Sequence, residues 1–197
     1  MKIYNLPNNS FVKVHDIFDP LPSFMHKADC VFTDPPYNQN LCTNFCYKKG
    51  AVLSSKNNTQ FDAFTNRFFM CVKEINPKFL FIEMGKEYLS WYIEECKKRY
   101  KYVTFYNSTY YKKKENKCYV IHATNIFKKR RYKELEDLDE EEIIKWICAH
   151  HEYKCIGDLC MGTGLVGKHA YLNGKSFVGT ELNKKRLAIL IDYIKKQ

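Results

Sequence analysis

The last fifty residues contain the feature that most restricts the fold. Residues 153–157 predict a strand, and a turn at 158–164 follows it. A helix is expected over 165–172, and a second strand at 176–180 ends at Glu181. A strand, a turn, a helix and another strand make a βαβ unit, in which the two strands lie parallel in one sheet. The sequence therefore predicts an α/β fold.

The turn between these strands is suited to hold a ligand. Gly162 and Gly164 let the backbone approach a ligand closely. Glu181, about twenty residues further on, suits a bidentate hydrogen bond to ribose hydroxyls. Together with Gly167 the two glycines match the spacing of a dinucleotide-binding turn, but Asp158 places a carboxylate beside them. A carboxylate disfavours a pyrophosphate and favours a cationic amino group, which indicates S-adenosylmethionine rather than a dinucleotide.

A second motif stands near the start of the chain, where Asp34-Pro35-Pro36-Tyr37 follows the apolar run 30–33. That run predicts a short buried strand, and ligands of open α/β sheets bind at the carboxyl ends of strands. Two prolines make a stiff turn without N–H groups, so the carbonyls of Asp34 and Pro35 are free to accept hydrogen bonds. An exocyclic amino group would suit them, and Tyr37 could stack on the ring that carries it. On the tetrapeptide alone, a plain strand-to-loop turn is an equal alternative.

The remaining elements follow from apolar periodicity. Strands 102–106 and 117–123, joined by a polar loop, predict an antiparallel pair. Residues 38–58 have no sustained period, which predicts a loop that is functional or mobile. Other strands are expected at 11–14 and 79–82, and other helices at 59–75, 86–100, 139–149 and 184–195, with Asp137 or Asp139 capping the third of these helices and Asn183 the fourth.

The charge balance favours a polyanionic partner. The chain has 32 basic and 22 acidic residues, a formal net charge of +10, and the alternative is a merely soluble basic surface. Clustering favours nucleic acid, because Tyr110, Tyr111 and Tyr132 are interleaved with the basic residues. The expected phosphate contacts are Lys112, Lys113, Lys114 and Lys117 in one cluster, and Lys128, Lys129, Arg130 and Arg131 in a second cluster next to Lys133.

Cysteine use and hydropathy indicate which cellular compartment suits the chain. The nine cysteines are an odd number without a Cys-x-x-Cys pair, which predicts reduced thiols in a cytoplasmic protein and no metal site. The pair His150 and His151 is interpreted as a helix end rather than a metal site. No membrane span and no signal peptide are expected. The length of 197 residues predicts one domain, 1–197.

Three motifs together resemble a known family. Asp34-Pro-Pro-Tyr37 matches, residue for residue, the catalytic motif of amino-methyltransferases that act on nucleic acid. The segment 158–164 resembles their Asp-Pro-Phe-Met-Gly-Ser-Gly cofactor motif, and 178–183 is similar to their second cofactor motif. Leu159 stands where the family usually has proline. Because the catalytic motif comes first and the cofactor motif last, the circularly permuted order resembles the β group of DNA adenine-N6 or cytosine-N4 methyltransferases.

The resemblance implies a fold and an activity. The fold is a Rossmann-like, S-adenosylmethionine-dependent methyltransferase fold, with a mostly parallel central sheet, one antiparallel strand, helices on both faces and no long target-recognition insert. The activity is transfer of a methyl group to adenine N6 in DNA after base flipping, without a metal. A homodimer or a separate specificity subunit is the expected partner besides DNA.

The resemblance also implies residue roles. The catalytic residues would be Asp34, Pro35, Pro36 and Tyr37. The cofactor-binding residues would be Asp16, Asp34, Asp158, Leu159, Cys160, Met161, Gly162, Thr163, Gly164 and Glu181. The basic residues of the two clusters would contact nucleic acid.

Alternative activities stay open at this point. Asp34 at the head of the catalytic motif favours adenine, since serine is frequent there in cytosine-N4 enzymes. An RNA adenine methyltransferase and a protein-amide methyltransferase are further candidates, although protein-glutamine enzymes usually have asparagine at this position and the unpermuted order. A non-catalytic nucleic-acid-binding subunit is the last alternative.

Overall fold

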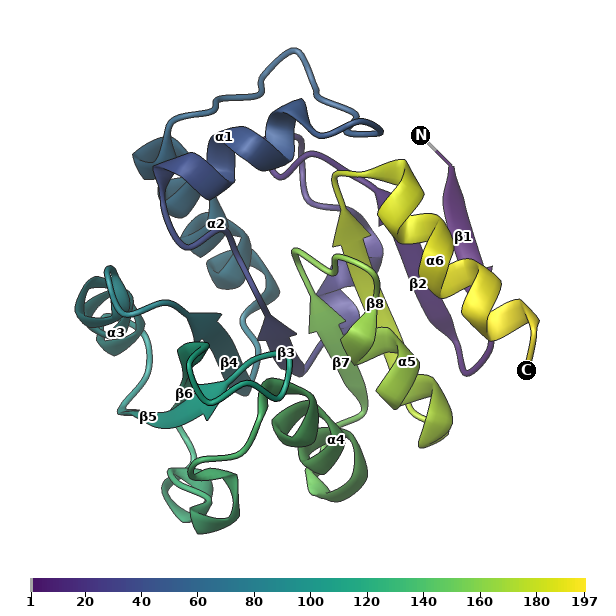
Figure 1. Cartoon of the computed structure of the whole chain (residues 1–197). Helices are drawn as coiled ribbons and strands as arrows, with labels where there is room; N and C mark the ends of the chain where they lie inside the picture. The colour runs from purple at the N-terminus through teal and green to yellow at the C-terminus, as the bar shows by residue number, and fades with distance from the viewer. Residues whose placement is uncertain (1) are drawn as a thin grey trace.

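One eight-stranded sheet organises residues 2–197, the part of the chain that the computed structural model describes (Figure 1). The strand order is β1-β2-β8-β7-β3-β4-β6-β5. The strands are β1 (Ile3–Leu6), β2 (Ser10–Val14), β3 (Cys30–Thr33), β4 (Phe79–Met84), β5 (Tyr102–Thr109), β6 (Lys117–Thr124), β7 (Cys155–Asp158) and β8 (Ser176–Glu181).

The sheet is mostly parallel, as predicted. Strands β2, β8, β7, β3 and β4 run parallel, and β6 lies antiparallel between β4 and β5. The edge strand β1 was not predicted and is a second antiparallel strand, since it pairs with β2 across a tight turn. Asn8 and Asn9 both take left-handed backbone there, with φ of 56° and 54°, which asparagine tolerates better than most residues.

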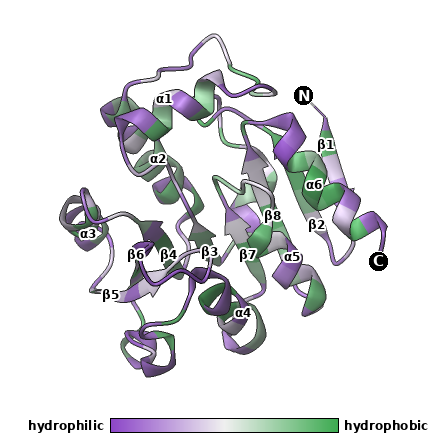
Figure 2. Ribbon diagram, viewed as in Figure 1, coloured by the Kyte–Doolittle hydropathy of each residue, from purple (hydrophilic) through white to green (hydrophobic). Residues whose placement is uncertain are grey.

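Helices cover both faces of the sheet, as predicted. The helices are α1 (Gln39–Tyr47), α2 (Phe61–Ile75), α3 (Leu89–Lys97), α4 (Glu140–His150), α5 (Leu165–Leu172) and α6 (Lys184–Lys195), with short 3-10 turns at Ser23–Lys27, Phe127–Lys129 and Lys133–Leu135. One apolar core joins the sheet to α4, α5 and α6, and the other joins it to α1, α2 and α3. Along α2, α4 and α6 hydrophobic positions alternate with hydrophilic ones, as helices with one buried face require (Figure 2).

Two predicted helix caps are present. The side chain of Asp139 caps α4 and forms a capping box with Glu142, whereas Asp137 takes a left-handed conformation before the helix. Asn183 caps α6 through the N–H groups of Lys185 and Arg186. Because α4 and α6 both begin at the carboxyl ends of the parallel strands, these caps lie next to the candidate site.

The prediction of a loop over 38–58 is wrong for its first half, which forms α1. The Asn38 side chain accepts a hydrogen bond from the N–H of Leu41 and starts this helix. Only Cys42 and Cys46 of α1 are buried, so the sequence shows too little periodicity to indicate a helix. The second half is irregular and is tied to α6 and its preceding strand, for example by the hydrogen bond from Val52 N to Leu182 O.

Within residues 2–197, no helix combines the length and the apolar character that crossing a membrane requires. In the same range no three His, Cys, Asp or Glu side chains gather into an arrangement that could hold a metal ion. All nine cysteines are free thiols, of which eight are buried and Cys160 is partly exposed.

Candidate functional site

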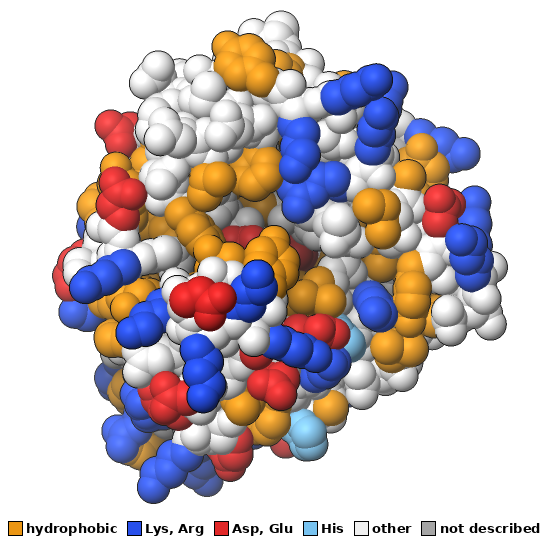
Figure 3. All heavy atoms as spheres, viewed as in Figure 1, with side chains coloured by type: hydrophobic (Ala, Val, Ile, Leu, Met, Phe, Trp, Pro, Cys, Tyr) orange, Lys and Arg blue, Asp and Glu red, His pale blue; other side chains and the backbone are white. Residues whose placement is uncertain are grey.

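A cavity of about 790 Å³ lies at the carboxyl ends of the parallel strands. It is bounded by the residues that follow β2, β3, β7 and β8, by the end of β4, and by parts of α1, α4 and α6. Figure 3 shows the hollow near the centre of the view, with acidic side chains inside it and basic side chains along its margin. Its position is the one in which open α/β sheets bind ligands.

The predicted cofactor turn forms one wall of this cavity. Glu181 Oε2 accepts a hydrogen bond from Gly162 N at 2.7 Å, and Glu181 Oε1 accepts one from Asn183 N at 2.9 Å. Asp158 Oδ1 accepts one from Cys160 N at 3.0 Å. These bonds join the end of β8 to the glycine-containing turn, so the two predicted cofactor motifs form one structural unit.

The glycines of this turn have different tasks. Gly162 lines the cavity at a φ of 55°, whereas Gly164 is buried behind the wall at a φ of 87°. A Cβ on Gly164 would lie 2.6 Å from the Cβ of Leu190. Gly164, predicted to bind the cofactor, therefore lets the turn pack against α6 and does not itself line the cavity. The other predicted members of this turn, Asp158, Leu159, Cys160, Met161, Gly162 and Thr163, all line it.

The predicted catalytic motif forms the facing wall. Asp34 leaves β3 with its side chain exposed to the cavity, Pro35 and Pro36 are buried, and Tyr37 is half-buried. The Tyr37 hydroxyl donates a hydrogen bond of 2.5 Å to Glu83 Oε1. Its ring packs against the backbone of Gly85, where a Cβ would approach Cδ2 of the ring to 3.2 Å. The tyrosine is thus held at both its hydroxyl and its ring.

Carboxyl groups crowd the floor of the cavity, and the pKa values of several are raised. Burial, together with the charges of Asp34 and Glu181, raises the pKa of Asp158 to about 8. Burial also raises the pKa of Glu181. The pKa of Asp34 is raised because the surrounding protein excludes bulk water and because Glu140 lies nearby. The guanidinium of Arg186 acts in the opposite direction on Asp34 and Glu181. The cavity thus has more acidic than basic groups, burial favours the protonated forms of several acids while it is empty, and a cationic ligand would favour their ionised forms.

Asp16, predicted near the cofactor, lies at the cavity but uses its carboxylate for the protein itself. It is 1% exposed, and its Oδ1 accepts from Phe18 N at 3.1 Å. Its Oδ2 accepts from Ser54 N at 3.0 Å and from Asn57 Nδ2 at 2.8 Å. Asp16 therefore fixes the irregular segment after α1, which forms the rim of the cavity.

The first basic cluster is at the cavity mouth. Lys112 lines the mouth together with Tyr110 and Tyr111, and Lys113, Lys114 and Lys117 belong to the same β5–β6 hairpin. The Lys112 N–H donates to Asp139 Oδ2 at 2.8 Å, which ties the tip of the hairpin to the start of α4. Tyr111 and Lys112 both take left-handed backbone, and the Tyr111 side chain is 78% exposed.

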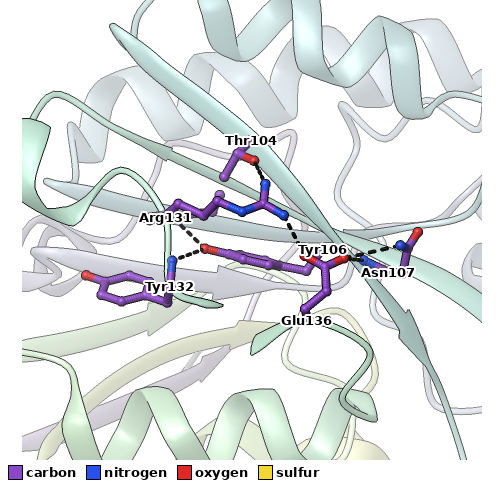
Figure 4. A network of polar contacts seen from close by, with 7 residues as sticks. Thr104, Tyr106, Asn107, Arg131, Tyr132 and Glu136 are labelled. Carbon is purple, nitrogen blue, oxygen red and sulfur yellow. Dashed lines mark hydrogen bonds and ion pairs between the residues drawn. The ribbon is translucent and has the colours of Figure 1, made fainter. Parts of the chain in front are cut away.

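The second basic cluster is not brought to the cavity. Lys128, Lys129, Arg130 and Arg131 follow the end of β6, and Thr124 at that end pairs with Phe79, the first residue of β4. The cluster therefore begins at the amino ends of the parallel strands, whereas the cavity lies at their carboxyl ends. Arg131 binds Glu136 at 2.6 Å and Thr104 at 2.7 Å over the ring of Tyr106 (Figure 4). Lys129 pairs with Glu152 at 3.6 Å.

Several cavity residues were not predicted from the sequence. Glu83 has a usable signal, because it follows the apolar run 79–82 in the way that Asp34 follows 30–33, and the register of Thr33 with Ile82 sets the two acids side by side. Glu140 has none, since acidic residues are ordinary in the first turn of a helix. Phe45, Lys48 and Arg186 are further examples, which come from α1, the residue after it and α6.

No protein-family model matches this sequence, and no curated protein matches it. Solved structures do match. The chain is similar to M1.HpyAVI, with a TM-score of 0.63, 13% identity, and coverage of 93% of this chain and 97% of that one. A DNA modification methylase from Thermus thermophilus, complexed with S-adenosyl-L-methionine, matches with a TM-score of 0.63, 12% identity, and coverage of 94% and 93%.

The PvuII DNA methyltransferase, which is cytosine-N4-specific, matches with a TM-score of 0.59, 10% identity, and coverage of 99% of this chain and 94% of that one. The likeness thus extends over nearly the whole length of each chain. It shows that this chain has the fold of DNA methyltransferases, and it confirms the predicted resemblance and fold class.

Proposed function

We propose that this protein is an S-adenosylmethionine-dependent DNA methyltransferase that modifies the exocyclic amino group of adenine, N6. The observation that carries the proposal is the meeting of two motifs in one cavity. Asp34 and Tyr37 from the end of β3 face the same space of about 790 Å³ as Asp158 and Glu181 from β7 and β8. The motifs stand more than a hundred residues apart in the chain, and an amino-methyl transfer needs both of them at one place.

The carboxyl groups of the cavity suit S-adenosylmethionine, which would supply an electrophilic methyl group when bound. Asp158 would lie near its ammonium group and Glu181 would accept hydrogen bonds from its ribose hydroxyls. Both carboxyls have raised pKa values, mainly through burial, and a bound cation would favour their ionised forms. M1.HpyAVI and the Thermus thermophilus methylase, similar in fold, have both been crystallised with this cofactor.

Asp34 and Pro35 would prepare the target amine. The lone pair of an aromatic amine is delocalised into the ring, which makes the nitrogen a poor nucleophile. Hydrogen bonds from the two N–H groups to the Asp34 carboxylate and the Pro35 carbonyl favour a pyramidal nitrogen whose lone pair is available. Positioning and electrostatics are the main contributions of such a site. Pro36 would keep the turn rigid.

Tyr37 would receive the flipped base. Extruding a base from a duplex costs a few kcal/mol, part of which stacking on an aromatic ring returns. The hydrogen bond to Glu83 and the contact with Gly85 hold the ring in place before the base arrives. A ring that is already ordered loses less conformational entropy on binding.

DNA would approach across the cavity mouth. Lys112, Tyr111, Lys48 and Arg186 all line the cavity. We assign the main phosphate contacts to Lys112, Lys113, Lys114 and Lys117. Lys128, Lys129 and Arg130 would touch only DNA that continues past the cavity, and Arg131 is already bound to Glu136. The expected salt dependence of binding follows from the number of phosphates contacted.

Adenine is proposed over cytosine on the ground of Asp34 at the head of the catalytic motif. Cytosine-N4 is the second candidate, which the similarity to the PvuII enzyme supports. Since the chain has no long insert for target recognition, the proposal includes a homodimer or a specificity subunit as partner. An intracellular location belongs to the same proposal, and the free thiols support it.

The test is transfer of tritiated methyl from S-adenosylmethionine to unmethylated duplex DNA, single-stranded DNA and RNA, followed by mass analysis of the digested nucleosides. N6-methyladenine in DNA is the expected product. N4-methylcytosine would show that cytosine, not adenine, is the target base. A product in RNA alone would show that RNA, not DNA, is the substrate. No product in any of the three, with cofactor binding intact, would contradict methyl transfer by this chain alone, and would mean that it needs a partner for target recognition or that its substrate is not nucleic acid.

A further inference from the structure

Glu83 is a buried acid that the proposed chemistry does not use. It stands near the end of β4, is 1% exposed, and lines the cavity. Within residues 2–197 no lysine or arginine forms an ion pair with it. A buried carboxylate without a cation is unfavourable, so the group requires either neutralisation or a proton.

The groups around Glu83 in the described part of the chain are acids and hydroxyls, so its carboxyl can be neutralised by a proton but not by a neighbouring cation. Its Oε1 accepts from Tyr37, and its Oε2 receives no hydrogen bond from any donor in residues 2–197. The carboxyl of Glu140 lies within hydrogen-bonding reach of Glu83, and burial raises the pKa of both acids. Two carboxylates repel each other, but one shared proton converts the repulsion into a hydrogen bond. The titratable groups that face Glu83 are Asp34 from β3, Tyr37, Cys118 from β6 and Glu140 from α4.

These groups form a continuous path from the amine site. The Tyr37 hydroxyl, which is bonded to Glu83, also lies close enough to the Asp34 carboxylate to lower the pKa of that group. The path runs from Asp34 through Tyr37 and Glu83 to Glu140. Glu140 is half-buried at the first turn of α4, beside the hairpin tip that Asp139 holds, so the path ends near the cavity mouth.

We propose that Glu83 and Glu140 share a proton and, through Tyr37, carry the proton released by the target amine from Asp34 to solvent. This inference rests on the proposed methyl transfer. It adds a proton route, with two positioning residues that do not touch the substrate.

The step balances in atoms and charge. The amine nitrogen forms a bond to the methyl carbon as the carbon–sulfur bond breaks, and the electron pair of that bond stays on sulfur. The nitrogen, now positive, loses one proton to Asp34. Asp34 passes a proton to the Tyr37 oxygen while Tyr37 gives its own to Glu83 Oε1, and Glu83 releases the shared proton to Glu140. Glu140 exchanges it with water, which restores every group.

The experiment compares Glu83→Gln and Glu140→Gln with Glu141→Gln. Glu141 is a matched control, because it is next to Glu140 but its carboxylate binds Lys145 and His169, both at 3.2 Å. Single-turnover methyl transfer near pH 7 is expected to fall about tenfold or more in the first two variants and to stay unchanged in the control. Cofactor affinity by calorimetry should stay within about twofold in all three, which also reports that each variant is folded.

The pH profile of the methyl-transfer rate distinguishes a proton route from a purely structural role, in which Glu83 only holds the Tyr37 side chain in place. In Glu83→Gln and Glu140→Gln the loss should shrink as the pH rises from about 7 to about 9, because hydroxide takes over removal of the proton. A loss that is equal at every pH would overturn the inference. Infrared difference spectra should also show that a protonated carboxyl band of the wild type is missing in both variants and retained in Glu141→Gln.

The outcomes distinguish this inference from the proposed function. Wild-type transfer with undiminished rates in both variants would overturn the proton route and leave the function standing. No methyl product from the wild type on any nucleic acid would overturn the function, and the route with it, whatever the infrared spectra show.

Discussion

The two ends of the sheet carry opposite polar chemistry. At the carboxyl ends of the strands, acids such as Asp158 and Glu83 are buried without cations, and their pKa values are raised. Towards the amino ends, buried His122 and His151 are bonded to tyrosine hydroxyls, at 3.2 Å to Tyr106 and 2.8 Å to Tyr132. Burial lowers the pKa values of these histidines to about 3 and about 4.

The carboxyl end of the sheet is suited to binding, whereas the polar groups at the amino end support the fold. Each neutral imidazole has a tyrosine hydroxyl as partner at one ring nitrogen and carries no charge that a ligand would have to balance, although His122 Nε2 and His151 Nδ1 have no partner in residues 2–197. Uncompensated carboxyls lower the stability of the empty protein and raise its affinity for a cation. Removal of a polar group should therefore cost activity at the carboxyl end and stability at the amino end.

The largest expected effect is that of Asp34→Ala. Because Asp34 would accept the amine proton, methyl transfer should fall by about a thousandfold or more. Cofactor affinity should change by no more than a few fold, since Asp158 and Glu181 remain. Methyl-transfer kinetics and calorimetry measure the two quantities. An equal loss of both would mean that Asp34 belongs to the cofactor site.

Asp158→Asn should separate binding from stability. Loss of the carboxylate should weaken the affinity for S-adenosylmethionine about a hundredfold, because the cationic amino group loses its partner. The free energy of unfolding should stay the same or rise, because a buried carboxyl without a cation has been removed. Tyr106→Phe is the control at the amino end, where unfolding should cost about 1–3 kcal/mol less and cofactor affinity should not change. A less stable Asp158→Asn protein would break the contrast between the two ends.

Stability should depend on pH in opposite senses at the two ends. The histidine pKa values are lower in the folded state, so acid favours unfolding, and stability should fall as the pH drops from about 6.5 towards about 4, by about 1 kcal/mol or more for each histidine. The Asp158 pKa is raised to about 8, so stability should also fall as the pH rises from about 4 to about 8. Denaturant unfolding at several pH values tests this, and Asp158→Asn should remove part of the fall in stability that the wild type shows as the pH rises to about 8. Between about pH 6.5 and pH 4 the two contributions oppose each other, so Asp158→Asn should lose stability more steeply on acidification than the wild type. An equal slope in the two proteins would contradict the raised pKa of Asp158.

The smallest expected effect concerns the two basic clusters. Glutamate at Lys112, Lys113 and Lys114 should weaken DNA binding about tenfold at moderate salt and reduce the slope of affinity against salt concentration. The same change at Lys128, Lys129 and Arg130 should weaken DNA binding less, since that cluster begins at the amino ends of the parallel strands, away from the cavity. Fluorescence anisotropy over a series of salt concentrations measures both. Equal effects would show that DNA reaches around the molecule.

Most strands and helices were predictable because their apolar periods are strong. Residues 30–33 and 79–82 form the buried strands β3 and β4, and Asn183 caps α6 as expected. The helix α1 was missed because only Cys42 and Cys46 face the core, and β1 because a four-residue edge strand has little burial to pattern it. A helix or strand that buries few side chains has little hydrophobic periodicity by which the sequence could predict it.

The local chemistry of the site can be predicted from short segments of the sequence. Asp34 at the end of one apolar run and Glu181 at the end of another are set by strand propensity, and both line the cavity. Tertiary structure alone decided which groups meet across the chain. The pairing of β3 with β4 sets Asp34 beside Glu83, and the direction of β6 sends Lys128 away from the cavity while Lys112 stays at its mouth. Strand order and direction come from packing of the whole sheet, which no local segment encodes.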